Sequence, residues 1–290
     1  MPKIDLEYIS FRLTKILKEV PPSVFSLRGL QQLLIQFKDE ELLPLSLSFT
    51  VFKKCFLELK EVREETILCP NYENKKEIRY LWKQPSVFDV ALSLRPRSYL
   101  SHGSAVFLHG LNDQIPKTIF VNQEQSKKEP PKKSSLTQES LNRAFASVKQ
   151  RRSRMIYEYG ETNITILNGK HTQELEVGNL ADRRVTKLER TLIDIVVRPE
   201  YAGGVYQVLE AYKGAKGKAS TNVLLATLKK LQYVYPYHQA IGFYMQRAGW
   251  QEKQYARLLK LELEFDFYLT YGIKESEYDR TWRLFYPQGF

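Results

Sequence analysis

The sequence has few of the residues that form covalent or metal cross-links. Cys55 and Cys69 are its only cysteines, and it contains four histidines in 290 residues. Both cysteines lie among apolar neighbours, which predicts reduced, packed thiols and excludes a disulfide-rich fold. A zinc site needs three or four ligands at suitable spacings, and these residues do not form such a set. We therefore expect no metal site.

Long apolar runs are also absent. A membrane-spanning helix needs about 18 consecutive apolar residues, and no stretch of the sequence approaches that length. The N-terminal stretch MPKIDLEYISFRLTKILKEV is charged throughout and lacks the apolar segment of a signal peptide. We expect a cytoplasmic protein without a membrane partner.

Phosphate-binding glycine patterns and common catalytic motifs are missing as well. Gly203-Gly204 and KGAKGK fit neither Walker nor dinucleotide spacing, so no nucleotide cofactor is expected. HGSAV lacks the second glycine of a Gly-x-Ser-x-Gly turn. Glu174 and Glu176 share a predicted strand, but no lysine follows at the spacing of a nuclease site. We interpret these two glutamates as surface charge.

The residues that are present predict a globular, strongly basic protein. A hydrophobic content of 43% over 290 residues suffices for two domains with cores of their own. The net charge is +11, and residues 86–155 carry 12 Lys and Arg against 5 Asp and Glu, a net +7. Residues 1–85 and 156–290 carry +2 each. This excess, concentrated in KKEPPKK and KQRRSR, predicts a polyanionic partner.

The first 85 residues have the pattern of a winged helix. Apolar residues from Leu6 to Val20 recur every three or four positions, which predicts a helix ended by Pro21-Pro22. Ser26 can cap a second helix over 27–42, and a third is expected over 46–62. ETILCP and EIRYLWKQ, joined by the turn-forming NYENKK, predict a β-hairpin. Three helices followed by a hairpin make a winged helix-turn-helix, in residues 1–85.

The third helix would present a polar, basic face. Phe49, Phe52 and Phe56 form an inward stripe, which leaves Thr50 and Lys53 on the opposite side, where they could reach bases and phosphates. Such domains also serve as protein-interaction modules. The predicted DNA contacts are Arg28, Gln31, Ser46, Ser48, Thr50, Lys53, Lys54, Lys75, Lys76 and Arg79. A second predicted surface, for nucleic acid or for the function of the C-terminal domain, comprises Lys132, Lys133, Lys149, Arg151, Arg152 and Arg154.

Residues 86–290 predict a second domain of mixed helix and sheet, so the whole chain is expected to be α+β. Expected helices cover 86–94, 102–110, 203–213, 221–232 and 237–248. Thr186 to Glu189 fits a capping box for a further helix. Expected strands are KTIFVNQ, a hairpin turning at Gly160-Glu161, LEFDFYLTY and WRLFYP.

His102 and His109 lie seven residues apart in SHGSAVFLHGL and would share one helix face, with Ser101 as the cap. Without further ligands, we interpret the segment as a helix whose small residues allow close packing. Whether either histidine faces a partner stays open at this point.

Three motifs together resemble the AbiEi family, the antitoxins of abortive-infection toxin–antitoxin systems of type IV. They are SYLSHGSAVFLHGLNDQIPKTIFV, RVTKLERTLIDIVVRPEYAGGVYQVLEAY and the ending FDFYLTYG with WRLFYP. The resemblance covers residues 85–290. It implies an N-terminal domain that binds inverted repeats in its own promoter and represses transcription. It also implies a C-terminal antitoxin domain that counteracts a nucleotidyltransferase toxin without a stable complex.

Two classes of function remain open from the sequence. One is a DNA-binding autorepressor fused to an antitoxin domain, without catalysis of its own. The other is an enzyme, a nuclease or transferase, that a winged helix delivers to DNA or RNA. The sequence offers no acidic or nucleophilic constellation that favours the enzyme.

Overall fold

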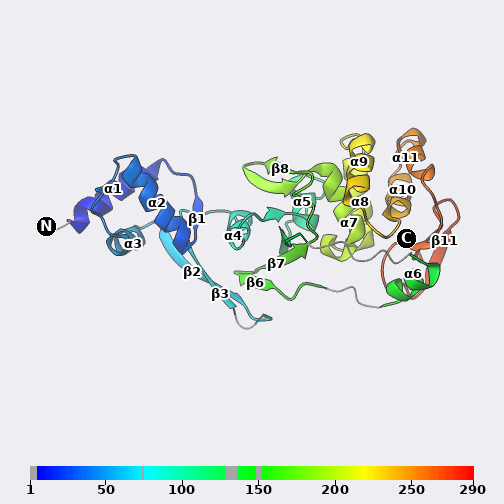
Figure 1. Ribbon diagram of the computed structural model, residues 1–290, viewed down its shortest axis with the longest axis horizontal. Coiled ribbons are helices and arrows are strands. Elements are labelled where there is room, and N and C mark those ends of the chain that lie inside the picture. Colours follow the sequence, from blue (N-terminus) through cyan, green and yellow to red (C-terminus); the bar gives the residue numbers. More distant parts are fainter. Residues whose placement is uncertain (1–4, 73–74, 128–135, 148–151) are drawn as a thin grey trace. The chain divides into compact units, whose positions relative to one another are not determined.

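The computed structural model describes residues 5–72, 75–127, 136–147 and 152–290. The fold is mixed α+β, as predicted, and forms two compact units (Figure 1). The first unit comprises Met1–Pro96 and Met155–Ile164, and the second comprises Arg97–Arg154 and Thr165–Phe290. The predicted boundary lies between residues 85 and 86, whereas residues 86–96 and 155–164 also group with the first unit.

The first unit contains three helices, a short strand between the first two, a hairpin, a fourth helix and the returning strand. Its elements are α1 (Leu6–Lys18), β1 (Ser23–Phe25), α2 (Leu27–Asp39), α3 (Phe49–Leu57), β2 (Val62–Cys69), β3 (Lys75–Trp82), α4 (Val87–Ser93) and β6 (Ile156–Tyr159). Its strand order is β1-β3-β2-β6, and β6 is followed by a turn at Gly160 and a strand that begins at Thr162.

Side-chain caps decide where the first three helices begin. The Asp5 carboxylate accepts from the Glu7 backbone N–H at 3.0 Å, and Ser26 Oγ accepts from Gly29 at 3.1 Å. Ser48 Oγ accepts from the Val51 N–H at 3.4 Å, so α3 begins at Phe49. The prediction that this helix begins at residue 46 was therefore wrong.

The first core is built from the inward faces of these helices and one end of the hairpin. Phe52 and Phe56 are fully buried, as the predicted stripe requires, and Cys55 is a buried free thiol. Trp82 Nε1 donates to the Val20 carbonyl at 3.1 Å, and Lys83 Nζ donates to the same oxygen at 2.8 Å. These bonds satisfy a carbonyl just beyond the end of α1 and fix that end against β3.

The second unit joins a sheet of order β7-β5-β4-β9-β8 to a group of helices, and a separate three-stranded sheet has the order β10-β12-β11. None of the helices in the described residues has the length and hydropathy needed to cross a membrane. The elements are β4 (Tyr99–Leu100), α5 (His102–Leu108), β5 (Thr118–Glu124), α6 (Gln138–Phe145), β7 (Thr162–Gly169), β8 (Val177–Leu180), β9 (Arg183–Thr186), α7 (Leu188–Val197), α8 (Val205–Ala215), α9 (Thr221–Leu231), α10 (Tyr237–Arg247), α11 (Glu252–Leu259), β10 (Phe267–Tyr268), β11 (Ser276–Asp279) and β12 (Leu284–Pro287).

Three local expectations for the second unit were wrong. Thr186 lies in β9 and hydrogen-bonds Thr191 at 2.8 Å, so Lys187 takes the N-cap position and no capping box forms. Ser101 occupies the N-cap position of α5, but its hydroxyl hydrogen-bonds His102 Nδ1 at 2.9 Å and accepts no backbone N–H of the helix. The strand expected over LEFDFYLTY is reduced to the two residues of β10, Phe267 and Tyr268, which pair with Leu284 and Phe285 of β12.

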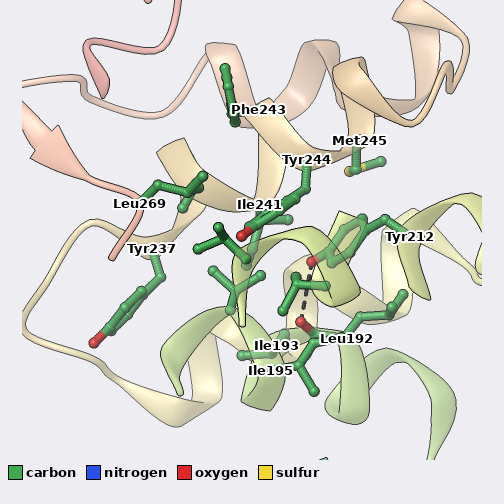
Figure 2. Close-up of a cluster of buried hydrophobic side chains, with 14 of the residues drawn as sticks. Leu192, Ile193, Ile195, Tyr212, Tyr237, Ile241, Phe243, Tyr244, Met245 and Leu269 are labelled. Carbon is green, nitrogen blue, oxygen red and sulfur yellow. Dashed lines mark hydrogen bonds between the residues drawn. The ribbon is translucent and has the colours of Figure 1, made fainter. Parts of the chain in front are cut away.

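The second core surrounds α7, α8 and α10 (Figure 2). Tyr212 is fully buried and its hydroxyl donates to the Leu192 carbonyl at 3.2 Å. Gly242, on α10, packs directly against the ring of the fully buried Trp282. A Cβ at residue 242 would lie 2.0 Å from the indole ring, so only glycine fits there.

We expect Gly242→Ala to destabilise the second unit by about 3 kcal/mol or more, because the indole has no free volume into which it could move. Denaturant unfolding would measure this loss. Gly29→Ala is a suitable control, since its Cβ would make ordinary contacts of 3.5 Å or more in α2; it should be neutral or stabilising by about 0.5 kcal/mol. Equal stability of Gly242→Ala and the parent would contradict this packing.

Candidate nucleic-acid interface

The outer face of α3 carries the exposed side chains best placed to contact a polyanion. Thr50 and Lys54 are exposed, and Ser48 lies exposed at the N-terminus of the helix. The positive end of the α3 dipole therefore lies beside two hydroxyl groups, and one lysine follows a turn later. Ser46, predicted to lie on this helix, is exposed but precedes it.

Lys53 is held more tightly than the sequence predicts. Its ammonium group lies 5.0 Å from the Tyr80 ring centre and 3.9 Å from the Glu64 carboxylate. Interaction with Tyr80 and the charge of Glu64 raise the pKa of Lys53, although burial opposes the shift. The side chain remains 31% exposed, so Lys53 can reach a phosphate only by giving up part of these contacts.

The remaining predicted DNA contacts lie at two other places in the unit. Arg28 and Gln31 are exposed on α2. Lys75 and Lys76 are exposed at the start of β3, opposite Cys69 and Leu68. At about 3.3 Å per strand residue, Lys76 lies roughly 13 Å along β3 from Tyr80, the residue that Lys53 contacts. The predicted DNA contacts that are exposed therefore lie on α2, on α3 with the residues just before it, and at the start of β3.

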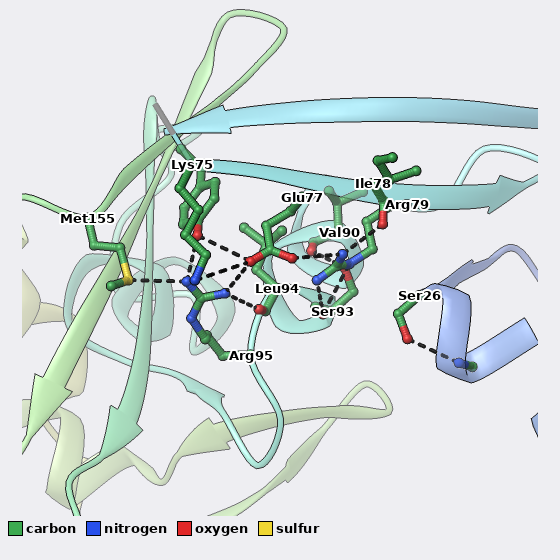
Figure 3. Close-up of polar contacts among 12 residues, drawn as sticks. Ser26, Lys75, Glu77, Ile78, Arg79, Val90, Ser93, Leu94, Arg95 and Met155 are labelled. Carbon is green, nitrogen blue, oxygen red and sulfur yellow. Dashed lines mark hydrogen bonds and ion pairs between the residues drawn. The ribbon is translucent and has the colours of Figure 1, made fainter. Parts of the chain in front are cut away.

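Arg79 is a correction to the predicted interface. Its side chain is 7% exposed and its guanidinium points inward, towards α4 (Figure 3). It donates to the Ser93 carbonyl at 2.9 Å and to the Ile78 carbonyl at 2.8 Å, and it pairs with Glu77 at 3.3 Å. These partners leave Arg79 unavailable to DNA, and we assign it to the interior of the first unit.

Glu77 is the centre of this internal network, which sequence reasoning missed. Arg95, just after α4, donates to Glu77 Oε1 at 2.9 Å and to the Tyr157 hydroxyl of β6 at 2.5 Å. Burial disfavours the Glu77 carboxylate, yet the hydrogen bond from Arg95 and the charges of Arg79 and Arg95 lower its pKa overall. Local sequence patterns could not predict that residues 77, 95 and 157 are in contact, because the three residues come from separate segments of the chain.

The second predicted basic surface lies largely outside the described residues. This applies to Lys132, Lys133, Lys149 and Arg151. Arg152 is exposed and pairs with Glu200 at 2.5 Å, and Arg154 is exposed. An exposed ion pair of this kind leaves the guanidinium accessible to another anion.

The two histidines of SHGSAVFLHGL serve the packing of the second unit. His109 Nε2 donates to the Thr186 carbonyl at 2.7 Å, which ties the end of α5 to β9. Burial lowers the pKa of His102 to about 4, so this ring is neutral at physiological pH. Nowhere in the described ranges do three His, Cys, Asp or Glu side chains group as metal ligands would.

The lowered pKa of Glu77 has a consequence for stability. A carboxylate whose pKa is lower in the folded state stabilises the fold above its ordinary value of 4.5, and that contribution is lost as the pH falls through the folded value. We expect Glu77→Gln to lower the free energy of unfolding by roughly 2–3 kcal/mol at neutral pH. The difference from the parent should shrink as the pH falls below 4.5 and through the lowered pKa of Glu77.

Denaturant titrations at several pH values would check this expectation. Glu61→Gln, at an exposed position in the same unit, is the matched control and should change stability by less than about 0.5 kcal/mol. A Glu77→Gln deficit that is independent of pH would assign the loss to packing and not to charge.

Comparisons with known proteins bear on the fold. No family model matches the chain, and no curated protein matches it. The crystal structure of the RV2827C protein from Mycobacterium tuberculosis is similar, with a TM-score of 0.57 and 13% sequence identity. The match covers 98% of this chain and 92% of that one. At this identity the similarity shows a common fold and carries no statement about activity.

Proposed function

We propose that the chain is an antitoxin of the AbiEi type, which represses its own operon through an N-terminal winged helix and counteracts a nucleotidyltransferase toxin. In this proposal the first unit binds inverted repeats in the promoter, and the C-terminal unit acts against the toxin without a stable complex. The chain itself has no catalytic role.

One observation carries the DNA-binding part of the proposal. The first unit runs helix, strand, helix, helix, strand, strand, and its three strands pair in the order β1-β3-β2. This is the element order of winged helices that insert their third helix into the major groove. The polar face of α3, with exposed Thr50 and Lys54, has the chemistry that phosphates and base edges require.

The antitoxin part rests on the three sequence motifs, all of which lie in the second unit. The small residues of SHGSAVFLHGL lie where close packing needs them. A Cβ at Gly103 would lie 2.9 Å from the Tyr201 carbonyl, and Ser104 Oγ accepts from the Phe120 N–H at 2.7 Å. The packing of the second unit therefore explains why small residues occupy these positions of the motif, and this is compatible with a family signature.

A nucleotidyltransferase gene in the neighbouring reading frame would be the direct genetic test of the antitoxin role.

We expect Lys54→Ala to weaken binding to the chain's own promoter. Removal of one phosphate-binding lysine should reduce the log–log salt slope of the binding constant by about 0.9. Fluorescence titration of a promoter duplex between about 50 and 200 mM salt would measure this. Lys18→Ala, an exposed lysine on α1, is the charge-matched control. The α3 assignment is wrong if Lys54→Ala keeps the slope and the affinity of the parent.

Repression and toxin neutralisation should be separable by substitutions on α3. Truncation near residue 86 would remove most of the first unit and strand its returning segment, so point variants are preferable. We expect Thr50→Ala with Lys54→Ala to lose promoter repression in a reporter assay and to retain full rescue from the toxin. Loss of rescue at normal protein levels would contradict the division of functions between the two units.

A further inference from the structure

Residues 156–290 carry a net charge of only +2, but they contain a strongly basic segment. Residues 211–260, which run from α8 to just beyond α11, contain nine Lys and Arg and a single acidic residue, Glu252. This net +8 exceeds the +7 of residues 86–155. All of these residues lie in the described part of the chain.

Two loops bring part of this charge together at one end of the helices α8 to α11. Trp250, in the α10–α11 loop, donates from Nε1 to the Tyr212 carbonyl near the end of α8 at 2.9 Å. Lys216 Nζ, from the α8–α9 loop, comes within 3.5 Å of the Cβ position at Gly249. Arg257 of α11 hydrogen-bonds the Asn222 side chain in the first turn of α9. We call this end of the helices the two-loop surface; its basic residues are Lys213, Lys216, Lys218, Lys253 and Arg257.

Four of the five cations of the two-loop surface form no ion pair with a described residue. All five basic side chains belong to exposed residues. Lys213 pairs with Glu210 at 2.8 Å, whereas Lys216, Lys218 and Lys253 form no ion pair with any described residue. The acidic groups nearby are Glu210, Glu252 of the first α11 turn, and Glu189, whose carboxylate accepts from the Ser220 N–H at 2.7 Å. Three carboxylates against five cations leave the surface positive.

Hydroxyl and amide groups accompany the lysines. Ser220 and Asn222 are exposed and Thr221 is half-buried, all within four residues of Lys218. Lysine ammonium groups bind phosphates as point charges without base specificity. The Ser220 hydroxyl accepts from the Val223 N–H as the cap of α9, and Asn222 Oδ1 accepts from Arg257. The Ser220 O–H, the Asn222 amide N–H and the Thr221 hydroxyl can still bond a ribose 2′-hydroxyl, the group that distinguishes RNA from DNA.

We propose that the two-loop surface binds the sugar–phosphate backbone of double-helical RNA. None of its residues belongs to the predicted basic residues 127–154 or to the α3 face. The inference does not depend on the antitoxin role, since a chain that represses no promoter would still bind RNA here.

The test compares two double variants of the full chain that remove equal charge from the same segment. Lys216→Gln with Lys218→Gln changes the two-loop surface. Lys229→Gln with Lys230→Gln changes exposed lysines at the opposite end of α9, roughly 12–15 Å away along its axis. The probes are an RNA duplex of about 20 base pairs and a DNA duplex of the same sequence, titrated by fluorescence anisotropy between about 50 and 200 mM salt.

We expect the first double variant to reduce the log–log salt slope for RNA by about 1.5, since two phosphate contacts contribute about 0.7–0.9 each. The second double variant should leave the salt slope for RNA unchanged, and the first should alter DNA binding less than RNA binding.

Equal losses of RNA binding in both double variants would attribute the effect to net charge and overturn the placement of the site on the two-loop surface. Equal losses for RNA and DNA would overturn the assignment to RNA, and failure of the parent to bind RNA would overturn the proposal. Lys54→Ala, carried alongside, keeps this result distinct from failure of promoter binding.

Discussion

The first unit depends on the Glu77 carboxylate, which holds two arginine side chains inside a domain of modest size. Through Arg79 it joins β3 to the end of α4, and through Arg95 it joins the same strand to Tyr157 of β6. Without the carboxylate, both arginines would keep hydrogen bonds to neutral groups but would lose this negative partner in a largely buried site, which is costly. This coupling is why α4 and residues 155–164 belong to the first unit although they lie beyond the three helices and the hairpin.

The same network limits which residues can contact DNA. Arg79 appears in the sequence as one more basic residue of the hairpin, but its guanidinium is used internally. Lys53 is partly engaged by Tyr80 and Glu64 on the adjoining strands. The proposed interface therefore relies on the exposed side chains of α3 and its N-cap, supported by α2 and by the start of β3. A smaller set of available cations is consistent with the modest charge of residues 1–85.

In the second unit, charge is arranged by the tertiary structure rather than by long basic runs. Lys216 and Lys218 are close in sequence, but Lys253 and Arg257 join them because the α10–α11 loop lies beside the α8–α9 loop. Acidic residues on either side of the segment in sequence cancel this charge in a sum over residues 156–290. The two basic loops are nevertheless exposed together, and an approaching polyanion responds to that local field.

The sequence by itself determined the α+β class, the three N-terminal helices with their hairpin, the inward Phe52 and Phe56 stripe, and the turn at Gly160. These features follow from helical periodicity, alternation, proline and glycine, which act over a few neighbouring residues. Only the tertiary structure decided the inward turn of Arg79, the burial that keeps His102 neutral, the failure of Thr186 to cap α7, and the return of β6 to the first unit. Each of these depends on a partner distant in sequence or on a competing hydrogen bond, and local patterns carry no information about which partner a buried polar group finds.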